Sequence, residues 1–276
     1  MNVTLWGTRG SLAAAGPETV RYGGNTSCVE IRGDDGTLLV FDAGTGIRRL
    51  GTSLGEVRRV DVLLTHLHMD HLEGLGFFGP LYQPEAEVHI WGPPSSTQNL
   101  QQRLIRYLSP PLFPVRLRDL PCCLTLHDVP LGPFRIGGCD LEADLVCHPG
   151  PTVGYRIREG ATVAAYIPDH EPALAVSDFR REPQWTSGYA LARGADLLIH
   201  DAQYTDLEYP QFVGWGHSAI GHALAFARLA GVARLIPFHH NPAHSDADLD
   251  ALIEGARRTN PPFEILPGQE GLSLQL

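Results

Sequence analysis

The amino-acid sequence predicts an α/β fold in which two β-sheets pack face to face between outer helices, an αββα sandwich of four layers. Three observations predict this fold. Short β-rich runs occur in both halves of the chain, amphipathic helical segments are interspersed among them, and no linker or low-complexity stretch divides the 276 residues. We therefore expect residues 1–276 to form a single domain. Composition by itself would fit other α/β layouts equally well.

The strands are predicted from apolar, β-branched runs that end at glycine-rich turns or at prolines. In the first half of the chain the predicted strands are Asn2–Trp6, Cys28–Arg32, Leu38–Asp42 and Val60–Thr65. In the second half they are Asp140–His148, Thr152–Arg158, Thr162–Pro168, Ala195–His200 and Val232–His239. The ending Phe263–Leu276 is expected to supply one or two closing strands.

Three segments show the spacing of apolar residues that is typical of helices. The first is Ser96–Leu108, which Pro110 and Pro111 should stop because proline cannot continue a helix. The second, Ser218–Ala230, is clearly amphipathic, and the third is Asp246–Thr259. Helices that alternate with strands in both halves are what the αββα arrangement requires.

Composition narrows the chemistry before any motif is considered. All 21 basic residues are arginine, which excludes a Schiff-base lysine, a lysine general base and a lysine-bearing phosphate loop. The formal net charge of −10 argues against broad nucleic-acid binding, so we expect no stable complex with nucleic acid. The 13 histidines are an unusual number. The chemistry of this chain is therefore sought where the histidines cluster.

The cysteines and the apolar runs indicate the compartment. Five cysteines without a CxxC pair fit reduced thiols better than a disulfide framework or a zinc ribbon. The first residues do not show the pattern of a signal peptide, and no apolar run approaches the roughly 20 residues of a membrane span. We expect a cytoplasmic protein that does not enter a membrane. The oligomeric state stays open, and a homodimer is compatible with the sequence.

The strongest motif directly follows the predicted strand at Val60–Thr65. It has the form HxHxDH, and its members are His66, His68, Asp70 and His71. Imidazoles and a carboxylate at alternating positions can converge on one point where a strand end turns into a loop, and they suit zinc as ligands. A polar loop with surface histidines is the alternative interpretation. That alternative fits the isolated His89 and His127 better.

Three later residues could complete a metal site, because each closes a predicted strand. They are His148, Asp169 and His239. Strand ends at one edge of a sheet sandwich are a natural place for a shared site. Taken alone, each of the three is as consistent with a structural role as with metal binding.

Together these motifs resemble the metallo-β-lactamase superfamily over nearly the whole chain. Within it the chain is most similar to the phosphodiesterase branch, which includes ribonuclease Z and cyclic-nucleotide phosphodiesterase-like proteins. The motifs that carry the resemblance are, in order, Leu5–Ser11 with Phe41–Gly46, His66–His71, His148 with Gly154–Ile157, Ile199–Tyr204, Gly216–Ser218 and Phe238–His239.

The resemblance implies a dinuclear zinc site. One Zn²⁺ would be held by His66, His68 and His148, the second by Asp70, His71 and His239, and Asp169 would bridge the two. The neighbouring His240 would then lie behind the ligands. Mn²⁺ or Fe²⁺ would accept the same ligands. Two such ions share and activate a water, which makes a metal-bridging hydroxide the implied nucleophile.

The same resemblance implies a general acid for the leaving alkoxide. His217, oriented and charged by Asp201, would be this general acid. Together with the metal ligand Asp70, these two residues are the predicted catalytic residues. The sequence departs from ribonuclease Z here, because aspartate replaces glutamate at Asp201 and Gln203 replaces the usual threonine. An alternative interpretation makes Gly216–Ser218 a helix N-terminus with Ser218 as its cap.

The size of the substrate is inferred from the absence of an inserted arm between two of the predicted ligands. About twenty residues separate His148 from Asp169, whereas ribonuclease Z enzymes commonly insert a tRNA-clasping arm there. We therefore expect a small anionic substrate, a small or cyclic phosphodiester, which Arg9 and Asn25 are candidates to contact. The alternatives are an ester, lactone or thioester hydrolase and an RNA-processing nuclease without the arm. Two further interpretations are disfavoured. A non-enzymatic binding protein with this fold would have lost some of the metal ligands, and none is missing here. An iron-based redox relative usually has an acidic residue at the position of His68.

Overall fold

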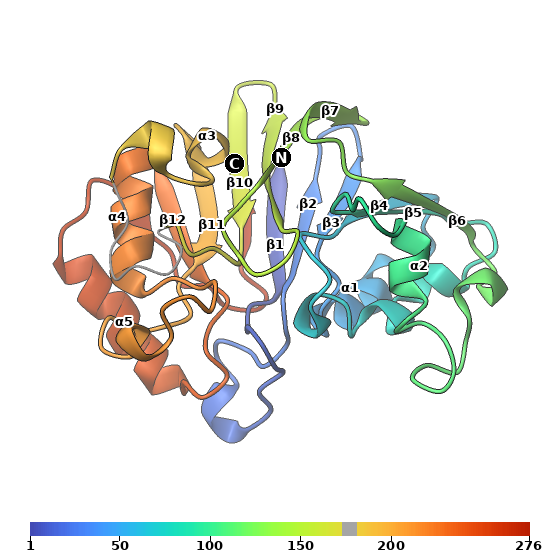
Figure 1. The fold of residues 1–276 in the computed structure, drawn as a ribbon, viewed down its shortest axis with the longest axis horizontal. Helices are drawn as coiled ribbons and strands as arrows, with labels where there is room; N and C mark the ends of the chain where they lie inside the picture. Colours follow the sequence, from blue (N-terminus) through green and yellow to red (C-terminus); the bar gives the residue numbers. More distant parts are fainter. Residues whose placement is uncertain (173–180) are drawn as a thin grey trace.

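The computed structural model describes residues 1–172 and 181–276, and two seven-stranded sheets form its centre (Figure 1). The first sheet has the order β14 (Ser273–Gln275), β1 (Asn2–Gly7), β2 (Cys28–Arg32), β3 (Leu38–Phe41), β4 (Arg59–Leu63), β5 (Glu87–Gly92) and β6 (Cys123–Asp128). The second has the order β13 (Glu264–Ile265), β12 (Arg234–Phe238), β11 (Leu197–Asp201), β10 (Thr162–Ile167), β9 (Val153–Glu159), β8 (Cys139–Leu145) and β7 (Gly132–Ile136).

Helices cover the outer face of each sheet. Among the described residues these are α1 (Gly46–Leu54), α2 (Leu100–Leu104), α3 (Tyr189–Ala192), α4 (Ile220–Ala230) and α5 (Asp246–Arg258). Figure 1 shows α1 and α2 beside the first sheet and α3, α4 and α5 beside the second. The predicted αββα sandwich is therefore confirmed. No helix in the described part of the chain has the length and apolar character that crossing a membrane demands.

Three layers of buried apolar side chains hold the sandwich together. The layer between the sheets contains the rings of Phe41, Tyr155, Tyr166 and Phe238, all of them buried. A second layer lies under α1 and α2, and a third lies under α3, α4 and α5. Because β-strands alternate their side chains, each sheet supplies one face to the central layer and the other to its own helices.

Parallel pairing sets the position of the functional residues. Strands β3, β4, β5 and β6 run parallel in the first sheet, and β10, β11, β12 and β13 run parallel in the second. The carboxyl ends of parallel strands meet at one edge of a sheet, so the residues that follow β4, β10, β11 and β12 emerge together. These include the HxHxDH segment, Asp169 and His239, and Asp201 is itself the last residue of β11.

The structure corrects three predictions about helices. No helix was predicted at α1, where two glycines weaken the helical pattern. One of them, Gly51, allows close packing, because a Cβ there would lie 2.8 Å from the backbone nitrogen of Gly79. The predicted helix Ser96–Leu108 is reduced to α2, which begins after an Asn99 capping box and ends well before Pro110. Ser218 does not cap α4: Ala219 holds that position, and the Ser218 hydroxyl donates to the carbonyl of His170.

Candidate metal centre and acid pair

The HxHxDH segment leaves the end of β4 and closes in a short 3₁₀ turn, Met69–His71. The turn directs His66, Asp70 and His71 inward, where all three are buried, and leaves His68 exposed at the surface. The backbone N–H of Ser11 donates to Asp70 Oδ2 at 2.7 Å, which fixes that carboxylate from the N-terminal loop. One strand end thus carries four candidate ligand side chains, three of them buried and one at the surface.

The seven predicted ligands lie together as two neighbouring groups, in each of which one ligand atom per residue falls within 4.8 Å of the others. The first group is His66, His68 and His148, and the second is Asp70, His71, Asp169 and His239. Asp169 contacts both groups, because one of its oxygens lies 3.1 Å from His71 Nε2 and the other lies 3.7 Å from both His66 Nε2 and His148 Nε2.

The geometry of the ring nitrogens tests whether a cation fits. His148 Nε2 lies 3.2 Å from His68 Nδ1, and His71 Nε2 lies 3.4 Å from His239 Nε2. Two ring nitrogens at these distances repel unless a proton or a metal cation lies between them. In addition, His66 Nε2 and Asp169 Oδ1 are buried without a hydrogen-bond partner among the described residues. A buried polar atom without a partner is costly, so this donor set fits divalent metal ions.

Outer hydrogen bonds decide which ring nitrogen faces the centre. His148 Nδ1 donates to the carbonyl of Gly216 at 2.8 Å, and His239 Nδ1 donates to Gln203 Oε1 at 2.8 Å. Each bond places the proton on Nδ1 and leaves the Nε2 lone pair free for a metal. Gln203, a departure from the ribonuclease Z pattern, therefore orients a ligand.

A buried carboxylate that the sequence analysis assigned no role, Asp42, supports the other side of the centre. It follows β3, lies 2.8 Å from His71 Nδ1 and accepts bonds from Thr65 and from the Tyr166 hydroxyl. The Thr65 hydroxyl in turn contacts His66 Nδ1 at 3.0 Å. The signal in the sequence is a single acid directly after an apolar strand, which says nothing about a partner 29 residues away.

The charge states also suit a cation. Burial lowers the pKa of His66 far below its ordinary value and lowers the pKa of His148 to about 4, so both are neutral ligands. Burial works to raise the pKa of Asp169, but its electrostatic interactions with the neighbouring imidazoles, those of His239 and His71 first, outweigh it and hold that pKa well below its usual range. His71 differs: burial acts to lower its pKa, but the carboxylates of Asp169, Asp42 and Asp70 outweigh it and hold that pKa well above its ordinary value. A divalent ion would displace the proton of His71, because imidazoles bind metals in the neutral form.

His239 lies among the ligands and His240 does not. The backbone of His239 adopts a left-handed conformation with φ 59° just after β12, which turns its ring toward Asp70 and Asp169. His240 instead contacts the carbonyl of Gly268 through Nε2, and burial lowers its pKa to about 3. The ring of His239 packs so closely on Gly10 that a Cβ there would lie 2.2 Å from His239 Nδ1.

His217 and Asp201 lie directly beside the ligands. His217 Nδ1 is 2.8 Å from Asp201 Oδ2 and 3.9 Å from Asp169 Oδ2. The centroids of the His217 and His148 rings are 5.0 Å apart. Burial lowers the pKa of His217, but the charge and hydrogen bond of the fully buried Asp201 reverse this and raise it above its ordinary value. The aspartate, although shorter than glutamate, therefore reaches the imidazole and favours its protonated form.

A second buried acid, Glu171, holds the loop that carries His217. Its carboxylate accepts bonds from the Tyr209 hydroxyl at 2.6 Å and from the backbone nitrogens of Gly214 and Gly216 at 2.8 Å each. Gly216 is the residue whose carbonyl orients His148. The sequence analysis did not identify Glu171, since nothing near it in the chain indicates that it binds a segment 43 residues away.

Of the two candidates for a phosphate contact, Arg9 is excluded because its side chain is 0% exposed. Its guanidinium donates to the carbonyls of Gly23, Asn241 and His244, so it ties the N-terminal loop to the segment after β12. Asn25 donates its side-chain amide to Glu270 at 2.9 Å. Both residues therefore stabilise loops around the centre. For Arg9 the physical reason is that a buried guanidinium needs hydrogen-bond acceptors, and backbone carbonyls provide them.

Comparisons with known proteins identify the family of the chain. The family model described as Beta-lactamase superfamily domain matches residues 37–240. Ribonuclease Z of Myxococcus xanthus is 29% identical to this chain over 261 residues, with 80% of the chain and 82% of the relative covered.

Two solved structures share the fold. One is the metallo-β-lactamase fold protein YhfI from Bacillus subtilis, with a TM-score of 0.72, 18% identity and 99% of this chain and 98% of that chain covered. The other is a diphosphatase from the PhnP family, with a TM-score of 0.70, 18% identity and coverage of 100% and 97%. The chain belongs to the metallo-β-lactamase superfamily and is a metal-dependent hydrolase.

Proposed function

We propose that this chain is a dinuclear, zinc-dependent phosphodiesterase that cleaves a small or cyclic phosphodiester. The observation that carries the proposal is the His217–Asp201 pair beside the seven clustered ligands. Cleaving a diester of an ordinary alcohol expels an alkoxide, which requires a proton, whereas the thiolate that leaves a thioester needs no such dedicated donor. A protonated imidazole that a buried carboxylate orients meets this requirement.

The ligands have separate parts in this proposal. His66, His68 and His148 would hold one Zn²⁺, Asp70, His71 and His239 the other, and Asp169 both. Divalent ions bound there supply positive charge and an activated water to the reaction. The same nitrogen and oxygen ligands could also bind Mn²⁺ or Fe²⁺, which accept similar donor atoms.

His217 delivers the proton. Its Nδ1 is bonded to Asp201, so the ring is fixed and the opposite nitrogen, Nε2, is the one free to act. Because Asp201 raises the pKa of His217, the imidazolium persists to higher pH than an isolated histidine would allow. In this role the proton passes from Nε2 to the leaving oxygen, and Asp201 stabilises the charge before transfer.

The relatives named ribonuclease Z favour a second candidate, the processing of an RNA end. The segment between His148 and Asp169 speaks against a tRNA substrate, because β9, β10 and the turn joining them fill it. With no lysine in the chain and a net charge of −10, the surface outside the centre also has little attraction for a polyanion. A small diester is therefore the preferred substrate.

The test combines metal content with a series of leaving groups. Purified protein should contain about two zinc ions per chain and should hydrolyse bis(p-nitrophenyl) phosphate. His217→Ala should lower turnover by roughly 10²–10⁴-fold for diesters of poorly acidic alcohols and much less for p-nitrophenyl esters, with zinc content unchanged. His127→Ala, which alters a histidine on β6 outside the centre, is the control. Hydrolysis of a lactone or thioester without any diester cleavage would overturn the proposal.

A further inference from the structure

A cavity of about 620 Å³ opens directly on the metal centre. It is lined by His66 and His68, by Pro149 and Pro151, and by residues of the segment from Pro93 to Leu112. A volume of this size is in the range of small-molecule sites. A substrate whose phosphodiester reaches the ligands would therefore place the rest of its structure in this cavity.

Much of the wall is apolar although it faces solvent. Met69 is 52% exposed and Leu112 is 70% exposed, and both line the cavity together with Leu72. Tyr107 also lines it, and its hydroxyl donates to the carbonyl of Glu73 at 2.6 Å. The hydroxyl is thus occupied, which leaves the ring as the surface available to a ligand. Exposed apolar side chains gathered at a cavity indicate a partner with an apolar or aromatic part.

Two arginines line the same wall and differ in their bonding. Arg103 is held in place, since its Nη2 donates to the carbonyl of Pro93 at 2.7 Å and lies 3.4 Å from Asp128. Arg106 is exposed, and among the described residues its guanidinium has neither a hydrogen bond nor an ion pair. None of the described residues lining the cavity is an aspartate or a glutamate. Arg106 is therefore a cation available to a ligand in the cavity that His66 and His68 also line.

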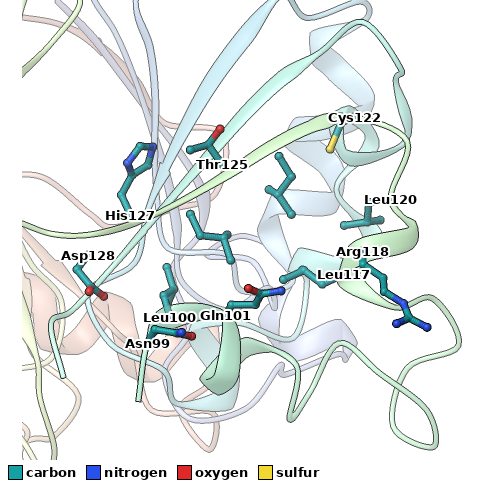
Figure 2. Close-up of a pocket in the computed structure, with 12 residues that line it drawn as sticks. Asn99, Leu100, Gln101, Leu117, Arg118, Leu120, Cys122, Thr125, His127 and Asp128 are labelled. Carbon is teal, nitrogen blue, oxygen red and sulfur yellow. The ribbon is translucent and has the colours of Figure 1, made fainter. Parts of the chain in front are cut away.

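The α2 segment separates this cavity from a second one. Figure 2 shows the second cavity, of about 590 Å³, which lies along β6 and is lined by Asn99 and Gln101 of the α2 segment and by Arg118. Its lining contains none of the metal ligands. Arg118 is thus an arginine of the same region, with its side chain 70% exposed, that does not face the metal centre. It is the matched control for Arg106.

We infer that the cavity at His66 and His68 selects phosphodiesters that carry a ring and, beyond it, a second anionic group, which Arg106 binds. This inference rests on the proposed function, which it makes more specific. The apolar wall takes the ring, the metal centre takes the phosphodiester, and the guanidinium of Arg106 forms a charge-assisted pair with the far anion. A nucleotide with phosphates at both ends of its sugar has this chemistry.

Binding tests the inference without relying on turnover. Zinc-loaded protein is titrated calorimetrically with thymidine 3′,5′-bisphosphate and with thymidine 5′-monophosphate. Wild-type protein should bind the bisphosphate about 10-fold more tightly, as one charge-assisted bond implies. Arg106→Ala should abolish this preference, Arg106→Lys should keep part of it, and Arg118→Ala should leave it intact. Because Arg106 is exposed, added salt should weaken the preference.

The two proposals fail in different ways. Equal binding of both nucleotides by wild-type protein, or equal weakening of both by Arg106→Ala, would overturn the inference. The hydrolysis of thymidine 5′-(p-nitrophenyl phosphate), with and without a 3′-phosphate, is then measured on the same preparations. If the wild-type protein cleaves neither ester, the proposed function fails, while the titration still decides whether Arg106 binds the second anion. If it cleaves both and Arg106→Ala raises KM for the bisphosphorylated ester alone, both proposals are supported.

Discussion

Replacing Glu171 with glutamine should disturb the metal centre without touching any proposed ligand. The carboxylate is fully buried and accepts three bonds, two at Oε1 from Tyr209 and Gly214 and one at Oε2 from Gly216. Glutamine has nearly the same shape but only one acceptor oxygen. If that oxygen keeps the two bonds of Oε1, the amide nitrogen faces the N–H of Gly216, and two donors then point at each other.

The expected loss of stability follows from the number of hydrogen bonds that the glutamine cannot accept. One buried N–H loses its acceptor, which costs roughly 1–3 kcal/mol, and the remaining bonds lose the strengthening that an ionised acceptor provides. We expect the free energy of unfolding of the metal-free protein to fall by about 2–4 kcal/mol. Displacement of Gly216 also removes the acceptor that orients His148. Loss of such an outer partner typically weakens metal binding about 10–100-fold.

Two measurements on the same variant check this reasoning. Urea unfolding of the metal-free protein gives the stability, and competition with a zinc chelator gives the metal affinity of the folded protein. Glu254→Gln, which alters an exposed helical residue 3.8 Å from Arg258, is the control and should change neither. Glu171→Gln with wild-type zinc affinity would refute the positioning role even if stability fell. Unchanged stability and unchanged affinity together would refute the whole account of this carboxylate.

Two further predictions concern close packing and thiol reactivity. Gly10→Ala would place a Cβ 2.2 Å from His239 Nδ1, so the His239 ring must move. Competition with a chelator should then show weaker zinc binding than in the wild-type protein. Gly255→Ala is the control, because its Cβ would have no neighbour closer than 3.8 Å. At pH 8 a thiol reagent should modify the exposed Cys123 in the native protein, whereas Cys139, buried and with a pKa that burial raises to about 11, should react only after unfolding. Mass spectrometry of the modified peptides checks this, and modification of native Cys139 would contradict it.

Most of the strands could be predicted from the sequence because each is a short apolar run between turn residues, but β5, β6 and β7 were not among those predicted. The structure reproduces Cys28–Arg32 residue for residue, and the two closing strands fall within Phe263–Leu276. The helices were harder. Gly46 and Gly51 argue against α1 locally, yet packing on the sheet and on Gly79 stabilises a helix there. Tertiary contacts of this kind have no signature in a window of the sequence.

The ligands and their supports differ in the same way. The HxHxDH motif is local, so its four candidate ligands could be proposed together, and the strand ends suggested His148, Asp169 and His239, which the structure brings beside them. The supporting contacts are long-range: Asp42 to His71, Gln203 to His239 and Glu171 to the His217 loop. Neither residue of such a pair indicates its partner. Arg9 was misinterpreted for the related reason that burial, which decides whether an arginine meets phosphate or carbonyls, is set by the whole fold.

One substrate panel tests the central claim most directly. The zinc-loaded protein is assayed with a 2′,3′-cyclic nucleotide, a 3′,5′-cyclic nucleotide, a precursor tRNA, a lactone and a thioester, and kcat/KM is measured for each. The account predicts that a small phosphodiester gives the highest kcat/KM and that His217→Ala reduces it without loss of zinc. Efficient cleavage of the precursor tRNA alone, or of the lactone or thioester with no diester cleavage, would contradict it.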